Sequence, residues 1–321
     1  MIGLKLMDFE MIEMKFKHTP VLFNETIESL NIKPDGIYID GTMGGGGHSE
    51  AILKKIRTGI LLSIDRDPEA MVAAQQRLFG YRSSIRVLGE YSSMDEIAHR
   101  QGIDMVDGIL LDIGVSSHQL DSSERGFSYH SDAPLDMRMS KQGLSAKDLV
   151  NSVSQQELSS IIFRYGEEKY AGRIAGAIAE NRQHKPIETT FELAEIVKNA
   201  VPAAVRRSTG HPARKTFQAI RIVVNDELGQ LEKGLKAAFD ILDSHGRLAV
   251  ITFHSLEDRI VKQQMNLWCE GCICPKDFPV CVCGQAPKGR LLYKRGLTAS
   301  AKELEKNPRA RSARLRVFEK Y

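Results

Sequence analysis

The amino-acid sequence predicts an α/β fold with a mostly parallel sheet and an inserted helical domain. Two observations support this prediction. In the first third of the chain, short apolar runs alternate with helical patterns, which indicates right-handed βαβ units and a parallel sheet. From Val115 to Ala213 the alternation stops, and no convincing strand pattern appears over about 100 residues, a length typical of a domain.

The predicted strands of the first part are apolar runs, and the last is nearly all apolar, as a buried parallel strand should be. These runs are Gly36 to Asp40, Ile60 to Asp65, Ile85 to Leu88 and Val106 to Ile113. Helical patterns with start signals separate or follow them, over Ser49 to Ile56, Pro68 to Leu78 and Ser92 to Arg100. The insertion shows four more helical patterns, at Ser145 to Val150, Gln155 to Tyr165, Ala171 to Asn181 and Phe191 to Ala200.

Strand and helix patterns return after the insertion. Helical periodicity from Thr216 to Leu242 leads into a fifth strand, Arg247 to Phe253. Ser255, with Asp258 three residues later, predicts a capping box at the start of the next helix. Alternation in Ala313 to Glu319 predicts a half-buried edge strand. We therefore expect one domain formed by residues 16–114 and 214–321, interrupted by an inserted domain at 115–213.

The composition is that of an ordinary globular chain, 42% hydrophobic and 26% charged, with a formal net charge of +3. The charge is uneven, because Lys288 to Tyr321 has a local net charge of +8 and the remainder −5. Such a basic segment fits either a solvated, ion-paired surface or a polyanionic partner. No run approaches the roughly 20 apolar residues that span a bilayer, and no signal-peptide pattern is present, so we expect a cytoplasmic protein with no membrane partner.

The strongest local motif is the run Asp40-Gly41-Thr42-Met43-Gly44-Gly45-Gly46-Gly47-His48, placed between a predicted strand and a helix. Glycines let a backbone approach a ligand closely, and open α/β sheets bind ligands at the carboxyl ends of strands. The spacing fits neither the G-x-G-x-x-G dinucleotide fingerprint nor a Walker loop. An acid precedes the glycines instead. Asp40 suits S-adenosylmethionine, which carries a sulfonium and an ammonium but no phosphate, either directly or through water.

A second acid follows the next predicted strand. Asp65 lies 25 residues after Asp40, where an acid can accept both hydroxyls of a ribose. Each aspartate alone is more simply interpreted as a loop or capping residue, but together they favour a ribose-bearing ligand. Tyr91, after the third strand, is expected either to stack on adenine or to pack as an ordinary core residue.

Motifs from Phe16 to Phe318 resemble one family. They are Phe16–Val21, Asp40–His48, Ile64–Asp67, Leu111–Ser117, Gln119–Asp121, Glu124–Ser128, Pro134–Met139, His211–Ala213, Thr216–Ala219, Phe253–Arg259 and Asn307–Ser312. The set is similar to the bacterial ribosomal RNA small-subunit methyltransferase H family, formerly called MraW.

This resemblance implies a class I S-adenosylmethionine-dependent methyltransferase, Rossmann-like, with an inserted helical domain for substrate recognition. It implies methylation of the exocyclic amine N(4) of one cytidine in small-subunit (16S) ribosomal RNA, in the decoding region, with the small ribosomal subunit as partner. It also implies cofactor contacts from Gly46, Gly47, His48, Asp65, Tyr91, Asp112 and Gln119. Another nucleic acid or a protein stays open as the substrate, as does a homo-oligomer.

Asp112 is the candidate catalytic residue. A cytosine amine is a poor nucleophile, and a hydrogen-bond acceptor on its protons would help it in a methyl transfer that depends mainly on alignment. Many amino methyltransferases place Asp or Asn after the fourth strand, followed by Pro-Pro and an aromatic residue. Here Ile113-Gly114-Val115 follows, so a contact to the cofactor alone remains an alternative. His211 is more often a turn residue and His254 a structural one.

Two further groups are candidates for binding. Basic residues that would contact RNA phosphates are Arg206, Arg207, Arg214 and Lys215, and then Arg309, Arg311, Arg314 and Arg316. Paired cysteines, at Cys272 with Cys274 and Cys281 with Cys283, resemble a zinc knuckle, although the usual spacing within a pair is wider than one residue. Structural zinc and free thiols both remain open.

Overall fold

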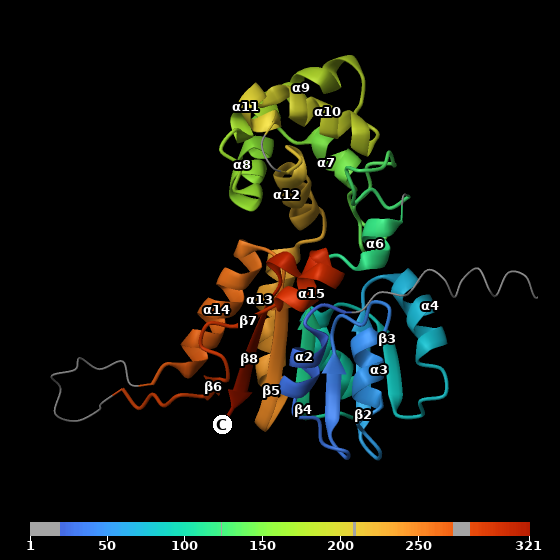
Figure 1. Ribbon diagram of the computed structural model, residues 1–321, viewed down its shortest axis with the longest axis vertical. Coiled ribbons are helices and arrows are strands. Elements are labelled where there is room, and N and C mark those ends of the chain that lie inside the picture. The colour runs from blue at the N-terminus through green and yellow to red at the C-terminus, as the bar shows by residue number, and fades with distance from the viewer. Residues whose placement is uncertain (1–19, 123, 208–209, 272–282) are drawn as a thin grey trace, which may run out of the picture. The chain divides into compact units, whose positions relative to one another are not determined.

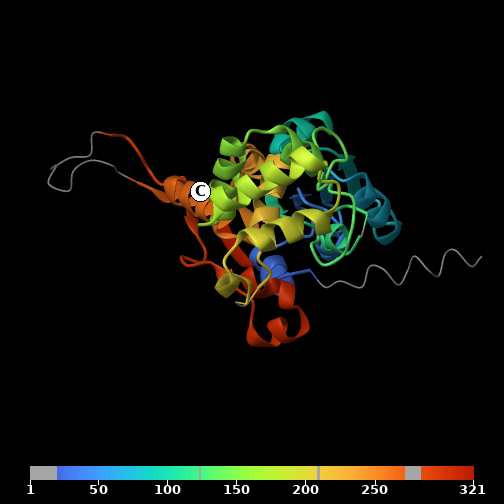
Figure 2. The same ribbon diagram turned by 90° about the horizontal axis from the view of Figure 1, so that it is seen from above.

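The computed structural model describes residues 20–122, 124–207, 210–271 and 283–321. The chain forms two compact units (Figure 1, and turned in Figure 2). The first, which we call the sheet unit, runs to Gly114 and resumes at Gln230–Tyr321. The second, the inserted unit, is Val115–Gly229. Each unit is described separately below.

The sheet unit contains eight strands among the described residues, in the order β3-β2-β1-β4-β5-β8-β6, with β7 also paired to β8. Neighbouring strands among β1 to β5 pair in parallel, and β8 pairs antiparallel with β5, β6 and β7. This arrangement confirms the predicted parallel sheet. The bounds are β1 (Ile37–Asp40), β2 (Ile60–Asp65), β3 (Ser84–Leu88), β4 (Val106–Asp112), β5 (Leu242–Thr252), β6 (Gly289–Leu291), β7 (Leu297–Thr298) and β8 (Arg314–Lys320).

Helices cover both faces of this sheet, and the apolar run Ile109–Leu111 of β4 shows the consequence for the sequence. Ile109 and Leu111 belong to one apolar cluster, whereas Leu110 belongs to the other, and all three are fully buried. Successive side chains of a strand point to opposite faces, so consecutive apolar residues in a strand need cover on both sides. The covering elements are α2 (Phe23–Ser29), α3 (Gly47–Leu53), α4 (Pro68–Arg77), η1 (Tyr91–Ser93), α5 (Met94–Arg100), α13 (Glu227–Ile241), α14 (Ser255–Cys269), α15 (Ala301–Lys306) and η2 (Pro308–Ser312).

Strand β8 lies inside the sheet, so the prediction of an edge strand is wrong. The short strands β6 and β7 pair along its outer side, and Leu315, Val317 and Phe318 are fully buried. Arg316 is only 3% exposed, and its guanidinium donates to both carboxylate oxygens of Asp258, at 2.7 and 3.0 Å. Because this charge is buried and paired, Arg316 is unsuited to the phosphate contact expected of it.

The helical periodicity predicted after the insertion belongs to two helices, α12 (Arg214–Val224) and α13, which are separated at Asn225. The side-chain amide of Asn225 donates to the carbonyl of Met137, and its oxygen accepts the N–H of Met139. Asp226 follows with a left-handed φ of 47°. The helix ends here because the Asn225 side chain satisfies backbone groups of a distant loop.

The inserted unit is a bundle of short helices with its own apolar core. Its helices are α6 (Ser117–Asp121), α7 (Ala146–Ser152), α8 (Gln155–Gly166), α9 (Ala171–His184), α10 (Thr190–Ala200), α11 (Ala203–Arg206) and α12. Side-chain oxygens of Ser145, Ser154 and Thr189 accept backbone N–H groups at the starts of α7, α8 and α10.

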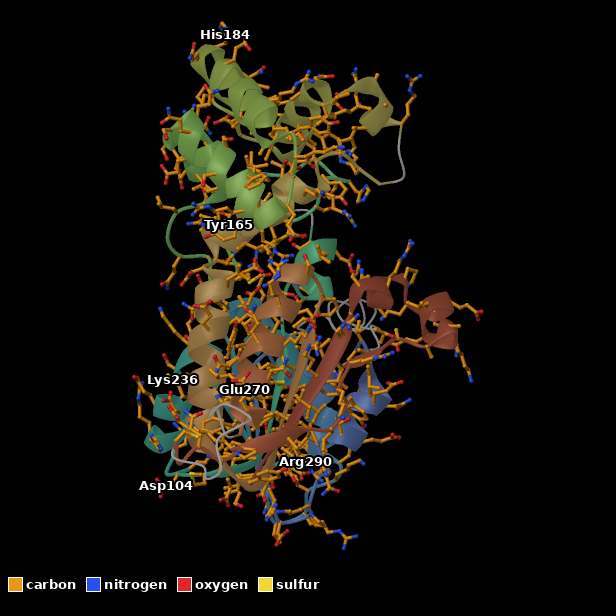
Figure 3. The ribbon with its side chains drawn as sticks, turned by 90° about the vertical axis from the view of Figure 1, so that its left-hand side faces the viewer. Asp104, Tyr165, His184, Lys236, Glu270 and Arg290 are labelled. Carbon is orange, nitrogen blue, oxygen red and sulfur yellow. The ribbon has the colours of Figure 1, made fainter. Side chains whose placement is uncertain are left out.

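The inserted unit extends to Gly229, beyond the boundary expected after Ala213, because α12 packs on α8. The Gln218 amide donates to the carbonyl of Tyr165, and the Lys215 ammonium donates to the carbonyl of Glu167 (Tyr165 is labelled in Figure 3). Across the parts of the chain that the structure describes, no helix is long and apolar enough to cross a bilayer.

Candidate nucleotide-binding site

The loop after β1 is built around the buried carboxylate of Asp40, which is 1% exposed. One carboxylate oxygen accepts the N–H of Thr42 at 3.2 Å, and the other accepts the Ser49 hydroxyl at 2.6 Å. Asp40 therefore joins the end of β1 to the first turn of α3 and fixes the loop from below. Its charge, rather than a free oxygen, is what it presents to a ligand.

Glycine is required at particular positions of this loop. Gly44 and Gly46 have left-handed φ angles of 51° and 76°, which strain any residue with a Cβ. A Cβ on Gly47 would lie 2.6 Å from Cγ of Pro20. Only glycine at these three positions allows the loop backbone to approach a ligand closely.

Asp65, at the end of β2, holds the same loop from the neighbouring strand. One of its carboxylate oxygens accepts the N–H of Gly44 at 2.7 Å, and the other accepts the N–H of Asp67 at 2.8 Å. Each carboxylate oxygen can accept a second hydrogen bond, so two acceptor positions remain on a partly exposed side chain. That capacity is what a pair of ribose hydroxyls needs.

Asp112 ends β4 and is tied to the glycine loop through its backbone, because its N–H donates to the Thr42 hydroxyl at 2.6 Å. One carboxylate oxygen lies 3.7 Å from Nδ1 of His48. The other is buried and has no hydrogen-bond partner among the described residues, and the same holds for Nε2 of His48. The His48 ring stacks on Phe23 of α2, with centroids 5.6 Å apart.

The three carboxyl groups share an unfavourable electrostatic environment. Burial, with the charges of Asp40 and Glu257, raises the pKa of Asp112 to about 8. Burial raises the pKa of Asp40 to about 6, partly offset by the hydrogen bonds from Ser49 and Thr42. Burial also raises the pKa of Asp65 to about 6, despite the N–H groups of Asp67 and Gly44.

The part of the chain that the structure describes supplies no cationic side chain to balance these carboxylates. Burial lowers the pKa of His48 to about 4, so this imidazole is neutral near pH 7. Within the described ranges, no Lys or Arg forms an ion pair with Asp40, Asp65 or Asp112. Because a nearby positive charge favours ionised carboxylates, the site suits a cationic ligand.

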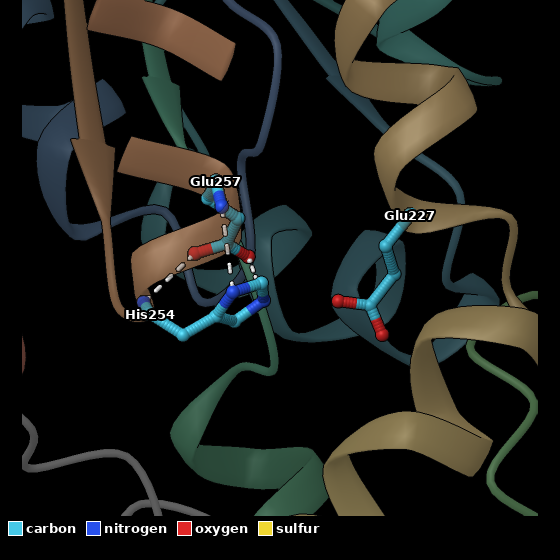
Figure 4. A group of neighbouring side chains, drawn as sticks. All are labelled: Glu227, His254 and Glu257. Atoms are coloured by element: carbon cyan, nitrogen blue, oxygen red, sulfur yellow. Dashed lines mark hydrogen bonds and ion pairs between the residues drawn. The ribbon is translucent and has the colours of Figure 1, made fainter. Parts of the chain in front are cut away.

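The turn after β5 leads to Glu257, whose charge contributes to the raised pKa of Asp112. The sequence did not predict this contribution. The Glu257 carboxylate is fully buried and accepts the N–H of Phe253 at 2.8 Å and of His254 at 3.2 Å. Nδ1 of His254 accepts the N–H of Glu257 at 3.4 Å, and Nε2 lies 3.0 Å from the Glu257 carboxylate (Figure 4). His254 and Glu257 thus form the capping box of α14, and the box predicted from Ser255 and Asp258 is wrong by one residue.

The structure brings most of the expected site residues together in the sheet unit. Asp40, Gly46, Gly47, His48, Asp65 and Asp112 all lie in the loop or at the strand ends just described. The Tyr91 ring is 9% exposed and packs against α13, where a Cβ on Gly234 would lie 2.5 Å from it, and a Cβ on Gly41 of the glycine loop would lie 3.1 Å from Cβ of Tyr91. Gln119 belongs to the inserted unit, where its side-chain oxygen accepts the N–H of Ser116 in a capping box.

Three contributors were missed at the level of sequence. Thr42 and Glu257 lie inside the motifs that carry the family resemblance, and only their roles were unassigned. Phe23 follows such a motif, and no local pattern predicts its contact with His48. Of the paired cysteines, Cys272, Cys274 and Cys281 lie outside the described residues and only Cys283 lies within them, so the choice between zinc and thiols stays a prediction.

A parallel sheet, a glycine loop and unbalanced carboxylates at the strand ends define a class I S-adenosylmethionine-dependent methyltransferase. The chain belongs to the MraW methylase family, whose model matches residues 15–321. It is 53% identical over 311 residues to the ribosomal RNA small subunit methyltransferase H of Symbiobacterium thermophilum, covering 96% of this chain and 98% of that protein. It is 52% identical over 312 residues to the protein of the same name from Acetivibrio thermocellus, covering 96% and 100%.

Proposed function

We propose that this chain methylates the exocyclic amine N(4) of one cytidine in the decoding region of small-subunit ribosomal RNA. The observation that carries the proposal is the set of buried and half-buried carboxylates at the strand ends, which form no ion pair with Lys or Arg of the described residues and so suit a positively charged nucleoside ligand. The RNA substrate is supported by relatives more than 50% identical over nearly their whole length, which are named as small-subunit ribosomal RNA methyltransferases.

The residues that would hold the ligand have different roles. The Asp65 carboxylate would accept the ribose hydroxyls, and the backbone at Gly46 and Gly47 would allow close approach. Asp40 would contribute its charge from beneath the loop. The other residues assigned to this contact are His48, Tyr91, Asp112 and Gln119. When bound, S-adenosylmethionine supplies a methyl group on a cationic sulfur.

Asp112 would act on the substrate amine as well as on the cofactor. Its unpartnered carboxylate oxygen can accept a hydrogen bond from an amine proton, which leaves the nitrogen lone pair more available. The Thr42 hydroxyl holds the Asp112 backbone, so the carboxylate is fixed at the strand end. Only the ionised form of Asp112 is a full acceptor, which makes its raised pKa part of the proposed mechanism.

Exposed basic residues would position the RNA through its phosphates. Arg206, Arg207 and Arg214 are exposed on the inserted unit, and Arg309 and Arg311 are exposed on the sheet unit. Phosphate contacts fix the register of the RNA without reading its sequence, and they make binding weaken steeply with added salt. We place this activity in the cytoplasm, with the small ribosomal subunit as the partner.

A direct test uses isotopically labelled S-adenosylmethionine and small subunits from cells that lack this methylation. Mass spectrometry of the digested RNA should find label on N(4) of a single cytidine in the decoding region. Asp112→Ala should abolish the transfer while Asp104→Ala, a change at an exposed loop residue, should leave it unchanged. Label on another RNA or on a ribosomal protein would instead support the alternative substrate.

A further inference from the structure

The inserted unit carries a cluster of aromatic rings that the proposed chemistry does not use. Tyr129 and His211 stack with centroids 4.5 Å apart and ring planes 16° from parallel. His130 lies 4.5 Å from Tyr129 on a tilted plane and 6.2 Å from His211. Phe217 meets Tyr129 edge-on at 5.5 Å and joins the cluster to the apolar core. Tyr129, His130 and His211, the ring cluster, therefore have a fixed base.

The outer side of the ring cluster is accessible and polar. His130 is exposed, and Tyr129 and His211 are partly exposed. Nδ1 of His211 accepts the N–H of Ala213, which leaves Nε2 to carry the proton of the neutral ring. Among the described residues, no partner is found for Nε2 of His211, for the Tyr129 hydroxyl or for the His130 ring nitrogens.

Positive charge lies beside these rings. Burial raises the pKa of the Tyr129 hydroxyl, and the charge of Arg214 lowers it in part, which places the exposed Arg214 close to the ring. Burial lowers the pKa of His211, and the charges of His130 and Lys198 lower it further against the opposing charge of Glu195. Lys198 is paired with Glu195 at 2.7 Å, so Arg214 is the free cation of the group among the described residues.

We propose that the ring cluster is a stacking site for an unpaired base of the RNA, separate from the nucleotide that is methylated. Flat rings with polar edges beside a free cation match the means by which proteins hold single-stranded RNA, namely stacking, edge hydrogen bonds and a phosphate contact. An exposed histidine such as His130, beside the stacked rings of Tyr129 and His211, adds little to the stability of the core. Stacking on an RNA base accounts for its place there. The choice of RNA as partner rests on the proposed function.

The test measures binding of a fluorescein-labelled single-stranded RNA of ten nucleotides by fluorescence anisotropy, with a duplex of equal length alongside. His130→Ala should weaken single-strand binding by roughly fivefold or more, the effect of losing one base–aromatic stack. His130→Phe keeps a ring and should bind within about twofold of the unaltered chain, since stacking tolerates any aromatic face. His184→Ala, at an exposed histidine ending α9, is the matched control and should have no effect (Figure 3).

A second variant tests whether the ring cluster, rather than His130 alone, binds the RNA. His211→Asn removes a ring but can keep the hydrogen bond from Ala213, because asparagine accepts the N–H two residues on. It should also weaken single-strand binding by roughly fivefold or more, and the duplex, whose bases already stack on one another, should respond less.

Two results would overturn the inference: His130→Ala and His211→Asn binding single strands as the unaltered chain does, or equal losses on single strands and duplex. Methylation of small subunits at normal efficiency by both variants, with unchanged RNA binding, would remove the stacking site and leave the proposed function standing. Conversely, a selective loss of single-strand binding in a chain that methylates no small subunit would retain the stacking site and reject the proposed function.

Discussion

Uptake of S-adenosylmethionine should release protons, and its affinity should therefore rise with pH. In the ligand-free site, burial and the charges of Asp40 and Glu257 raise the pKa of Asp112 to about 8. A bound cation favours the ionised carboxylate and lowers that pKa, so the free protein holds more protons than the complex. The affinity therefore rises with pH, because raising the pH removes from the free protein the protons that binding would otherwise have to release. His48 adds no opposing change above pH 6, since burial already keeps it neutral there.

The magnitude can be worked from the same value. Each pH unit below a pKa of about 8 costs binding up to about tenfold, or about 1.4 kcal/mol, for one proton released. Between pH 6.0 and 7.5, Asp112 alone would thus change the affinity by at most about thirtyfold. Its side chain is 24% exposed, so water screens part of the effect and we expect about fivefold to thirtyfold. Asp40 and Asp65, with pKa values of about 6, add to the slope only at the acid end.

Isothermal titration calorimetry in buffers of different ionisation enthalpy counts the protons released. The range ends at pH 7.5 because the α-amino group of the ligand titrates near 8. Asp112→Asn should reduce the count by close to one at pH 7 and flatten the dependence of affinity on pH. A count of zero in the unaltered chain, or the same count in Asp112→Asn, would refute the electrostatic reasoning.

Three shorter predictions follow from the same geometry. Asp112→Asn should stabilise the ligand-free chain at pH 7 by at most about 4 kcal/mol, because the raised pKa of Asp112 in the folded state removes stability as the pH rises from about 4 to 8. Thermal melts at pH 5 and 7 should show a stabilisation that grows with pH, and a stabilisation independent of pH would contradict this prediction. Gly46→Ala and Gly80→Ala, with φ of 76° and 89°, should each lose about 1 kcal/mol of stability, but only Gly46→Ala should weaken cofactor binding in calorimetry. Glu257→Gln should shift the pH midpoint of cofactor binding downward, since one charge that raises the pKa of Asp112 is removed; an upward shift would contradict the assigned cause.

The parts of the fold that the sequence predicted are those fixed by local chemistry. β1 and β2 end at Asp40 and Asp65 as predicted, because an apolar run, an acid and a glycine-rich turn are all visible within a few residues. The break at Asn225 was not predictable in this way, since its cause is a pair of hydrogen bonds to Met137 and Met139, more than 80 positions earlier. β8 was predicted as an edge because its partners β6 and β7 have only three and two residues, too short for a pattern.

The same distinction between local sequence and distant contacts applies to the site. The residue types at the strand ends were evident from sequence, but the charge state of Asp112 depends on burial and on Glu257, which reaches it only through the folded β5–α14 turn. A chain selected for stability alone would not keep one buried and two half-buried carboxyl groups near one another without a cation. The rest of the fold must offset this cost, through an apolar core on both faces of the sheet. The electrostatic cost is then relieved only when a positively charged ligand occupies the strand ends, which couples the stability of the sheet unit to cofactor binding.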